Sequence, residues 1–318
     1  MAFRLQPNDT VGKEIFRLLQ EQTTRAIRAA GDKRYPAAER ARQARVACKK
    51  IRAALELVRC HAPKRFKREG RCFRDAARSL ADIRDHGAVL STLQRLHRST
   101  AHHVRINPLS FRHIREALDD HHRHHSGASV KAGAVLQTFC HKLKTERARL
   151  EHTKLKGAKQ DGFAFIEAGF RRSYARARTT FYKANESAHD DALHTWRKRT
   201  KTHLNQCRLL ERTCPGIMPP RVRELKRLTS LLGDEHDLTI LRERIGDTDL
   251  APQNRSTVKA IRQQIVRRLT ELRAEALAMG QSLFLEKPRD FAPRVATGWN
   301  ASQSTSPRSS RKAQSDRS

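Results

Sequence analysis

Two stripes of basic residues are the part of this sequence that is best equipped for chemistry. In each stripe, cationic residues recur at intervals of three, four or seven positions, which places them on one face of a helix. The first stripe contains Arg42, Arg45, Lys49 and Arg52, and the second contains His194, Arg197, Lys201 and Arg208. These side chains donate charge-assisted hydrogen bonds to phosphate oxygens. The stripes therefore indicate a site for a phosphate-bearing anion.

The face opposite each stripe is apolar, so each helix is expected to be half core and half cationic surface. Ile51 and Leu55 lie opposite the first stripe, and Trp196 and Leu210 lie opposite the second. A charged face is often only a solvated surface. Here, like charges three and four residues apart repel by roughly 0.2–0.5 kcal/mol per pair, and Glu56 is the nearest acid to the first stripe. An anionic ligand would relieve that repulsion, and we therefore favour a binding role.

The two stripes belong to stretches that match at a constant offset of 152 residues. Arg45 corresponds to Arg197 (197 − 45 = 152), and the segment LADIRD at 80–85 corresponds to LGDEHD at 232–237. The register runs without a gap between these matches. Such a register predicts an internal duplication, with the two cationic helices in equivalent positions.

The composition predicts a helical protein with an anionic partner. Of 318 residues, 66 are Lys or Arg and 33 are Asp or Glu, which gives a formal net charge of +33. Such an excess works against compaction unless an anion is present. Gly (14) and Pro (11) together make about 8% of the chain, below the usual ~12%, which argues against a many-stranded sandwich or barrel.

Short segments exclude several classes of protein. No apolar run approaches the ~18 residues of a membrane helix, and the start, MAFRLQPNDT, lacks the hydrophobic region of a secretory signal. The six cysteines include no CxxC pair, which is typical of reduced thiols in a cytosolic protein. We therefore expect a cytoplasmic protein with no membrane-spanning part.

Hydrophobic periodicity predicts an all-α fold, and no segment shows a convincing strand pattern. The expected helices cover about 10–29, 37–60, 66–83, 84 to beyond 96, 130–155, 163–183, 191–211, 218–232, 234–245 and 257–279. The end of the chain, 287–318, is rich in Ser, Arg and Pro and carries seven Lys/Arg against two Asp. We expect this segment to be a disordered basic tail, because it is short of aliphatic residues.

The motifs around the stripes resemble those of the CHAD domain family, whose name abbreviates conserved histidine α-helical domain. The family's second-repeat pattern H-x-W-R-K-R-x-K is met in full at 194–201. GFRRSYARAR at 169–178 is similar to the signature that precedes that repeat, and LLGDEHDL at 231–238 is similar to a later helix start. In the first repeat the pattern's histidine is Arg42, which can donate to phosphate but cannot act as an acid or base.

The resemblance spans about residues 8–284 and implies two pseudo-symmetric helical bundles with a basic channel between them. It places the first helical repeat at about 8–157 and the second at about 161–284. It also implies binding of inorganic polyphosphate, in some members on polyphosphate granules. From the residues themselves we expect no cofactor and no metal. The residues expected to hold polyphosphate are Arg42, Arg45, Lys49, Lys50, Arg52, His194, Arg197, Lys198, Lys201 and Arg208, supported by Arg171, Arg172, Arg178, Arg25 and Arg28.

Two other groups of residues invite a metal-binding interpretation. His121 and His125 are at i,i+4, but no third and fourth ligand is evident nearby, so we favour a solvated or phosphate-touching histidine patch. Asp85 and Asp237 are expected to pair with Arg or to cap a helix start rather than to bind a metal. P-loop, GxSxG and HExxH motifs are absent from the sequence, and we therefore expect a protein that is not an enzyme.

Two alternatives to polyphosphate binding stay open. The net charge and the basic tail would suit a nucleic-acid-binding protein equally well. Against it stand 5% aromatic residues and the absence of RNP-like and zinc-finger motifs. An enzyme of polyphosphate metabolism is the third possibility, although its metal ions would need clustered carboxylates that the basic faces lack.

Overall fold

The protein is all-α, as predicted. The computed structural model describes residues 3–6, 9–100, 107–126, 128–151, 161–187 and 189–304, without the side chains of 84–86, 99–100, 121–126, 128–131 and 151. Eleven α-helices, one 3-10 turn and no strand make up this described part of the chain. Of the described helices, none combines the length and the apolar composition needed to span a lipid bilayer.

The helices follow one another with short connections. The first six are α1 (Val11–Gly31), α2 (Ala37–Leu57), α3 (Pro63–Ser79), α4 (Ala81–Thr100), α5 (Pro108–Ser126) and α6 (Ala128–Glu151). The other five are α7 (Phe163–Ser187), α8 (Asp190–Leu209), α9 (Met218–Asp247), α10 (Arg255–Leu283) and α11 (Pro288–Ser304), with the 3-10 turn η1 (Pro252–Asn254) between α9 and α10.

The two halves of the chain have the same helix order. α7 begins 152 residues after α1 (163 − 11), and α8 ends 152 residues after α2 (209 − 57). The long helix α9 covers the span of α3 and α4 together. α10 and α11 then follow where the first half has α5 and α6, and α11 packs on α7 as α6 packs on α1. This is the order that an internal duplication would produce, and the duplication itself stays our interpretation.

Helix α9 differs from the sequence prediction, which broke it at Gly233 into 218–232 and 234–245. It is one helix of 30 residues. Leu225, Leu228 and Leu232 on one side of the glycine and Leu238 and Leu241 on the other are all buried. A glycine within a helix costs only about 1 kcal/mol relative to alanine, which is small beside the burial of five leucines.

The prediction of a disordered tail from residue 287 is wrong for its first half. Residues 288–304 form α11, and Phe291, Val295 and Trp299 at i, i+4 and i+8 are buried against the protein. The ring of Phe291 lies 5.6 Å from that of Phe170 on α7. The average composition of the tail concealed this apolar stripe. The second half of the fold therefore extends to residue 304, beyond the expected boundary at 284, and residues 305–318 lie outside the described part.

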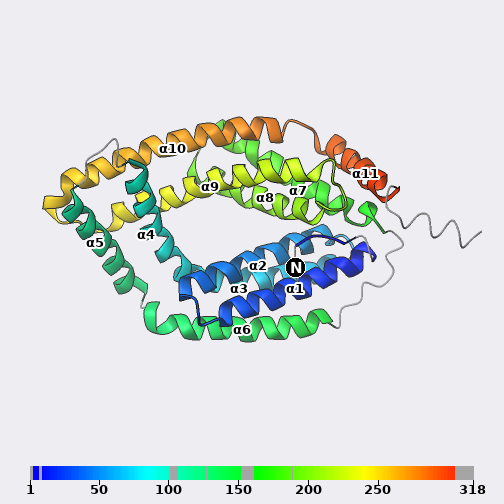
Figure 1. Ribbon diagram of the computed structural model, residues 1–318, viewed down its shortest axis with the longest axis horizontal. Helices are drawn as coiled ribbons and strands as arrows, with labels where there is room; N and C mark the ends of the chain where they lie inside the picture. The colour runs from blue at the N-terminus through cyan, green and yellow to red at the C-terminus, as the bar shows by residue number, and fades with distance from the viewer. Residues whose placement is uncertain are drawn as a thin grey trace, which may run out of the picture.

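The hydrophobic core is divided differently from the two halves of the sequence. Figure 1 shows α1, α2, α3 and α6 in one group and α7 to α10 in another, with α4 running from the first group to the second. The main core joins α1, α2 and α3 to α7, α8 and α11. A second core is formed by α4 and α5 of the first half with α9 and α10 of the second. Each of the two hydrophobic cores is therefore built from helices of both halves of the chain.

Candidate functional site

The two cationic stripes are brought together because α2 packs directly on α8. The buried Gln206 of α8 donates from Nε2 to the carbonyl of Ala53 on α2 at 3.0 Å. Helix α7 also comes close to α2, since a Cβ on Gly169 would lie 2.1 Å from the Leu57 carbonyl oxygen. These contacts fix α2 and α8 side by side, so that the cations on both helices meet.

The first group of cations lies toward α1, and we call it the α1-side cluster. It consists of Arg25 on α1, Lys50 on α2, and Arg197, Lys201 and Arg208 on α8. Burial, together with the charges of Arg25 and Arg208, lowers the pKa of Lys50 to about 8. Burial and the charges of Arg197 and Arg208 also lower the pKa of Lys201. The charges that lower the pKa of these two lysines come from other cations, whereas Glu211 favours the charge of Arg208.

The second group lies on the other side of α2, and we call it the α3-side cluster. It consists of Lys49 and Arg52 on α2, Arg74 and Arg78 on α3, and His194, Lys198 and Arg199 on α8. Burial lowers the pKa of Arg52. The charges of Arg74 and Arg199 also lower it, whereas Glu56 raises it. The pKa of Lys198 is lowered by burial and then by its arginine neighbours.

Arg197 connects the two clusters. Its charge lowers the pKa of Lys201 in the α1-side cluster, and it lowers those of His194 and Lys198 in the α3-side cluster. The clusters are therefore neighbouring parts of one basic surface that extends across the α2–α8 pair.

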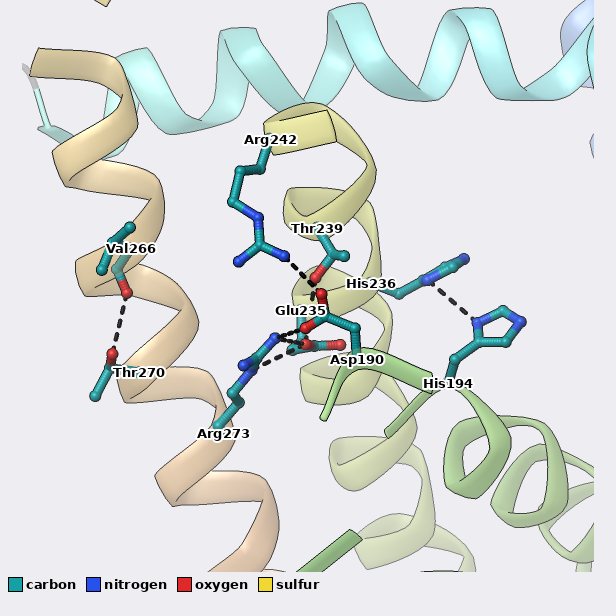
Figure 2. Close-up of polar contacts among 9 residues, drawn as sticks. All are labelled: Asp190, His194, Glu235, His236, Thr239, Arg242, Val266, Thr270 and Arg273. Atoms are coloured by element: carbon teal, nitrogen blue, oxygen red, sulfur yellow. Dashed lines mark hydrogen bonds and ion pairs between the residues drawn. The ribbon is translucent and has the colours of Figure 1, made fainter. Parts of the chain in front are cut away.

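His194 is the one predicted site histidine, and it is paired with a histidine that the sequence analysis did not single out. Its Nδ1 atom lies 3.2 Å from Nδ1 of His236 on α9 (Figure 2). Burial and the charges of Lys198 and Arg197 lower the pKa of His194 to about 4. A neutral histidine at this position accepts or donates one hydrogen bond to its partner. His236 lies within the segment LGDEHD at 232–237. The match of this segment to LADIRD at 80–85 was a feature of the sequence that pointed to this region.

A network of ion pairs fixes the start of α8 relative to α9 and α10. Asp190, the first residue of α8, pairs with Arg242 at 2.6 Å and also with Arg273. Arg273 of α10 in turn pairs with the buried Glu235 of α9 at 2.7 Å (Figure 2). Because His194 lies one helical turn after Asp190, this network also positions the histidine pair.

Several predicted residues serve the structure in ways that the sequence did not reveal. Arg42 pairs with Glu39 at 2.6 Å on the surface, and Arg45 donates to the Ala77 carbonyl at 2.9 Å. Arg172 donates to the Glu56 carbonyl at 3.2 Å. Arg178 donates to the Phe284 carbonyl at 2.9 Å and stacks on Tyr182. The guanidinium groups of these four arginines are thus occupied by contacts within the protein. Lys50, Lys201 and Arg208 are the predicted residues that lie together in the α1-side cluster.

Arg28 on α1 and Arg171 on α7 are exposed, and no described contact joins them to either cluster. By contrast, the structure adds Arg74, Arg78 and Arg199 to the predicted residues. A signal for the two residues on α3 was present in the sequence. Lys67, Arg71, Arg74 and Arg78 recur at intervals of four, three and four, which is the spacing of the two stripes already recognised.

The residues considered as metal ligands are His121, His125, Asp85 and Asp237. Among the side chains it describes, no group of three or more His, Cys, Asp and Glu residues could hold a metal ion. The side chains of His121, His125 and Asp85 lie outside the described part. Asp237 lies near Arg95, with an Oδ2–Nη2 distance of 3.7 Å, in agreement with its expected pairing with arginine.

Comparison with known protein families identifies most of this fold. A family model described as the CHAD domain matches residues 14–246, which is more than half of the chain. The matched span runs from α1 to the end of α9 and includes both cationic stripes. A search of curated proteins found no match to the chain.

Proposed function

Because the chain belongs to the CHAD domain family, which is associated with polyphosphate, we propose that it binds inorganic polyphosphate across the α1-side and α3-side clusters. The ligand carries about one charge per phosphate and has no bases or sugars. A site for it needs Lys and Arg donors, without aromatic platforms or groups that read base edges. The chemistry of the two clusters fits this requirement.

The observation that carries the proposal is the half-buried position of Lys50 and Lys201 among cations. Burial and like charge both disfavour the protonated form of a lysine. A protein gains nothing in stability from such an arrangement, whereas a bound polyanion turns each repulsion into an attraction. The free energy lost in the unliganded protein therefore becomes free energy of binding.

The continuity of the clusters through Arg197 supports a linear ligand. Successive phosphates of one chain can contact first one cluster and then the other, while orthophosphate can occupy only one position at a time. We therefore expect affinity to rise with chain length until both clusters are occupied. We expect it to fall steeply with salt, since each phosphate contact releases bound counterions.

The experiment that tests the class of ligand is a competition titration of the full chain at fixed, near-physiological salt. Labelled long-chain polyphosphate is displaced by unlabelled polyphosphate, duplex DNA or single-stranded RNA, matched by phosphate count. The proposal expects polyphosphate to compete at least tenfold better than either nucleic acid. Equal competition would instead identify a general polyanion binder and would favour the nucleic-acid alternative.

We further propose that the protein binds polyphosphate without cleaving it, in the cytoplasm and in association with polyphosphate granules. The basic surface offers donors for phosphate oxygens rather than clustered carboxylates for Mg²⁺. Incubation of the protein with polyphosphate and Mg²⁺ or Mn²⁺ tests this part. Release of orthophosphate that is lost in a variant of the clusters would overturn it.

A further inference from the structure

A separate groove lies at the end of the α9–α10 hairpin, around the connection that contains η1. It has a volume of about 720 Å³. The apolar part of its lining includes Ile245, Leu250, Val258 and Val266. Ile245 belongs to the second core, and Leu250 and Val258 pack against that core. The groove is therefore an opening onto apolar side chains that the protein's own helices leave partly uncovered.

The rim of this groove is cationic. Arg255, Lys259, Arg262 and Arg267 line it, and no acidic residue is present in the described lining. Arg255, Lys259, Arg262 and Val266 recur at intervals of four, three and four, so they share one face of α10. Arg262 donates to the Ile245 carbonyl at 3.4 Å, which holds its side chain across the hairpin.

The groove differs from the basic clusters because it exposes apolar side chains to solvent. Val266 is 55% exposed, although it lies on a helix with four buried aliphatic residues in the second core. Polyphosphate would neutralise the rim but would leave the valines in water. A ligand that covers the whole groove must carry both acidic groups and apolar surface.

We propose that this groove binds an acidic amphipathic helix of a partner protein. Apolar side chains at i, i+3, i+4 and i+7 of such a helix would cover Leu250, Val258 and Val266, while flanking Asp or Glu would pair with the rim. The proposal does not depend on polyphosphate binding, because it concerns different helices and a different chemistry.

The chain itself does not supply a suitable occupant. Its segments outside the described part contain eight Lys/Arg and one acid, Asp316. A second copy brings a net charge of +33 to a cationic rim. Charge complementarity thus favours a partner with acidic character over an intramolecular contact or self-association.

The test uses a fluorescein-labelled peptide of sixteen residues, with Leu at i, i+3, i+4 and i+7 of a helix and Glu on the flanks. Its binding to the full chain is measured by anisotropy at near-physiological salt. Val266→Asp is compared with Leu285→Asp, which places the same charge at another exposed apolar residue, 73% exposed. Thermal unfolding verifies that both variants fold.

The proposal expects Val266→Asp to weaken binding at least tenfold and Leu285→Asp to change it less than twofold. A peptide with Ser in place of Leu should also bind at least tenfold more weakly. Equal weakening by the two variants, or equal binding of the Ser peptide, would overturn the proposal. So would a dimer in sedimentation that Val266→Asp abolishes, because the occupant would then be a second copy.

Discussion

His194 and His236 approach each other through their Nδ1 atoms, 3.2 Å apart, although 42 positions separate them in the sequence. Two nitrogens at this distance hold one proton between them, so at least one ring is neutral. The equivalent positions of the first half are Arg42 and Arg84 (194 − 152 and 236 − 152). In the inferred duplication, two arginines therefore stand at the sequence positions that correspond to the two histidines.

The histidine pair predicts proton uptake on ligand binding. In the unliganded protein His194 faces Arg197, Lys198 and Asp191 from α8, Lys49 from α2 and His236 from α9, and its pKa is about 4. A bound polyanion stabilises the imidazolium and raises this pKa, so affinity should increase as the pH falls from 7 toward 5. Calorimetry at pH 6 in buffers of different ionisation enthalpy should show uptake of a fraction of a proton. His194→Asn should remove most of it, and unchanged uptake in that variant would contradict this account.

The position of Lys50 predicts that a loss of binding accompanies a gain in stability. Lys50→Met removes a half-buried charge beside Arg25 and Arg208, together with the ammonium that lies 5.2 Å from the centre of the Phe3 ring. We expect the Tm of the unliganded protein to rise by roughly 1–3 °C and the affinity for polyphosphate to fall several-fold. Lys13→Met, which removes an exposed lysine paired with Asp9, is the matched control and should leave the affinity unchanged. A lower Tm for Lys50→Met would show that the lysine has a stabilising partner.

The same lysine gives the unliganded protein an unusual dependence on pH. Its pKa is about 8 in the folded protein and 10.5 in the unfolded chain. Between these values the unfolded state binds more protons, so the contribution of Lys50 to stability increases as the pH rises from about 8 to 10.5. Urea unfolding at several pH values should therefore show a smaller gain over this interval for Lys50→Met than for the wild type. Identical gains would contradict the buried position of the charge.

The ion-pair network at the start of α8 makes a prediction about stability. Arg273→Met leaves the buried carboxylate of Glu235 without its partner, which should cost about 3 kcal/mol in urea unfolding. Arg267→Met on the same helix removes a partner of the exposed Glu271 and should cost less than about 1 kcal/mol. Equal losses of unfolding free energy for the two substitutions would show that the network stabilises the protein no more than an exposed ion pair does.

Helix α11 predicts where the chain can be shortened. Trp299 is 5% exposed, with its ring 6.1 Å from that of Phe163, and Trp299→Ala should cost about 3 kcal/mol. Truncation after residue 304 should leave the unfolding midpoint almost unchanged, whereas truncation after residue 287 should lower it strongly. Equal midpoints for both truncations would show that α11 adds no stability, as expected if the whole segment from residue 287 were disordered.

Much of the fold could be predicted because helical periodicity is a local property of the sequence. The spacing of Ile51 and Leu55 against Arg45 and Lys49 was sufficient to place the first stripe on the outer face of a helix. The boundaries were less predictable. Gly233 appeared to end a helix, and only the packing of the flanking leucines shows why it does not. The stripe of Phe291, Val295 and Trp299 was hidden by averaging over a polar segment.

The site was predictable in its chemistry but not in its pairings. Spacing identified Arg197 and Lys201, while their neighbours come from other helices and depend on how those helices pack. Arg74 and Arg78 join the site because α3 folds back on α2, and His236 joins it because α9 passes the start of α8. Such long-range relations have no signature in local periodicity, apart from the repeat that linked 80–85 to 232–237.

The proposed function requires that one polyphosphate chain is held by the cations of the α2–α8 pair. The most direct test measures the Kd for long-chain polyphosphate at fixed salt in Arg197→Ala plus Lys201→Ala. The control, Arg223→Ala plus Arg227→Ala on α9, removes the same net charge at the same i,i+4 spacing, and Arg227 pairs with Glu275. The account predicts at least a tenfold loss of affinity in the first variant and less than a twofold change in the control. Equal losses in the two variants would contradict it, because binding would then depend on net charge and not on this site.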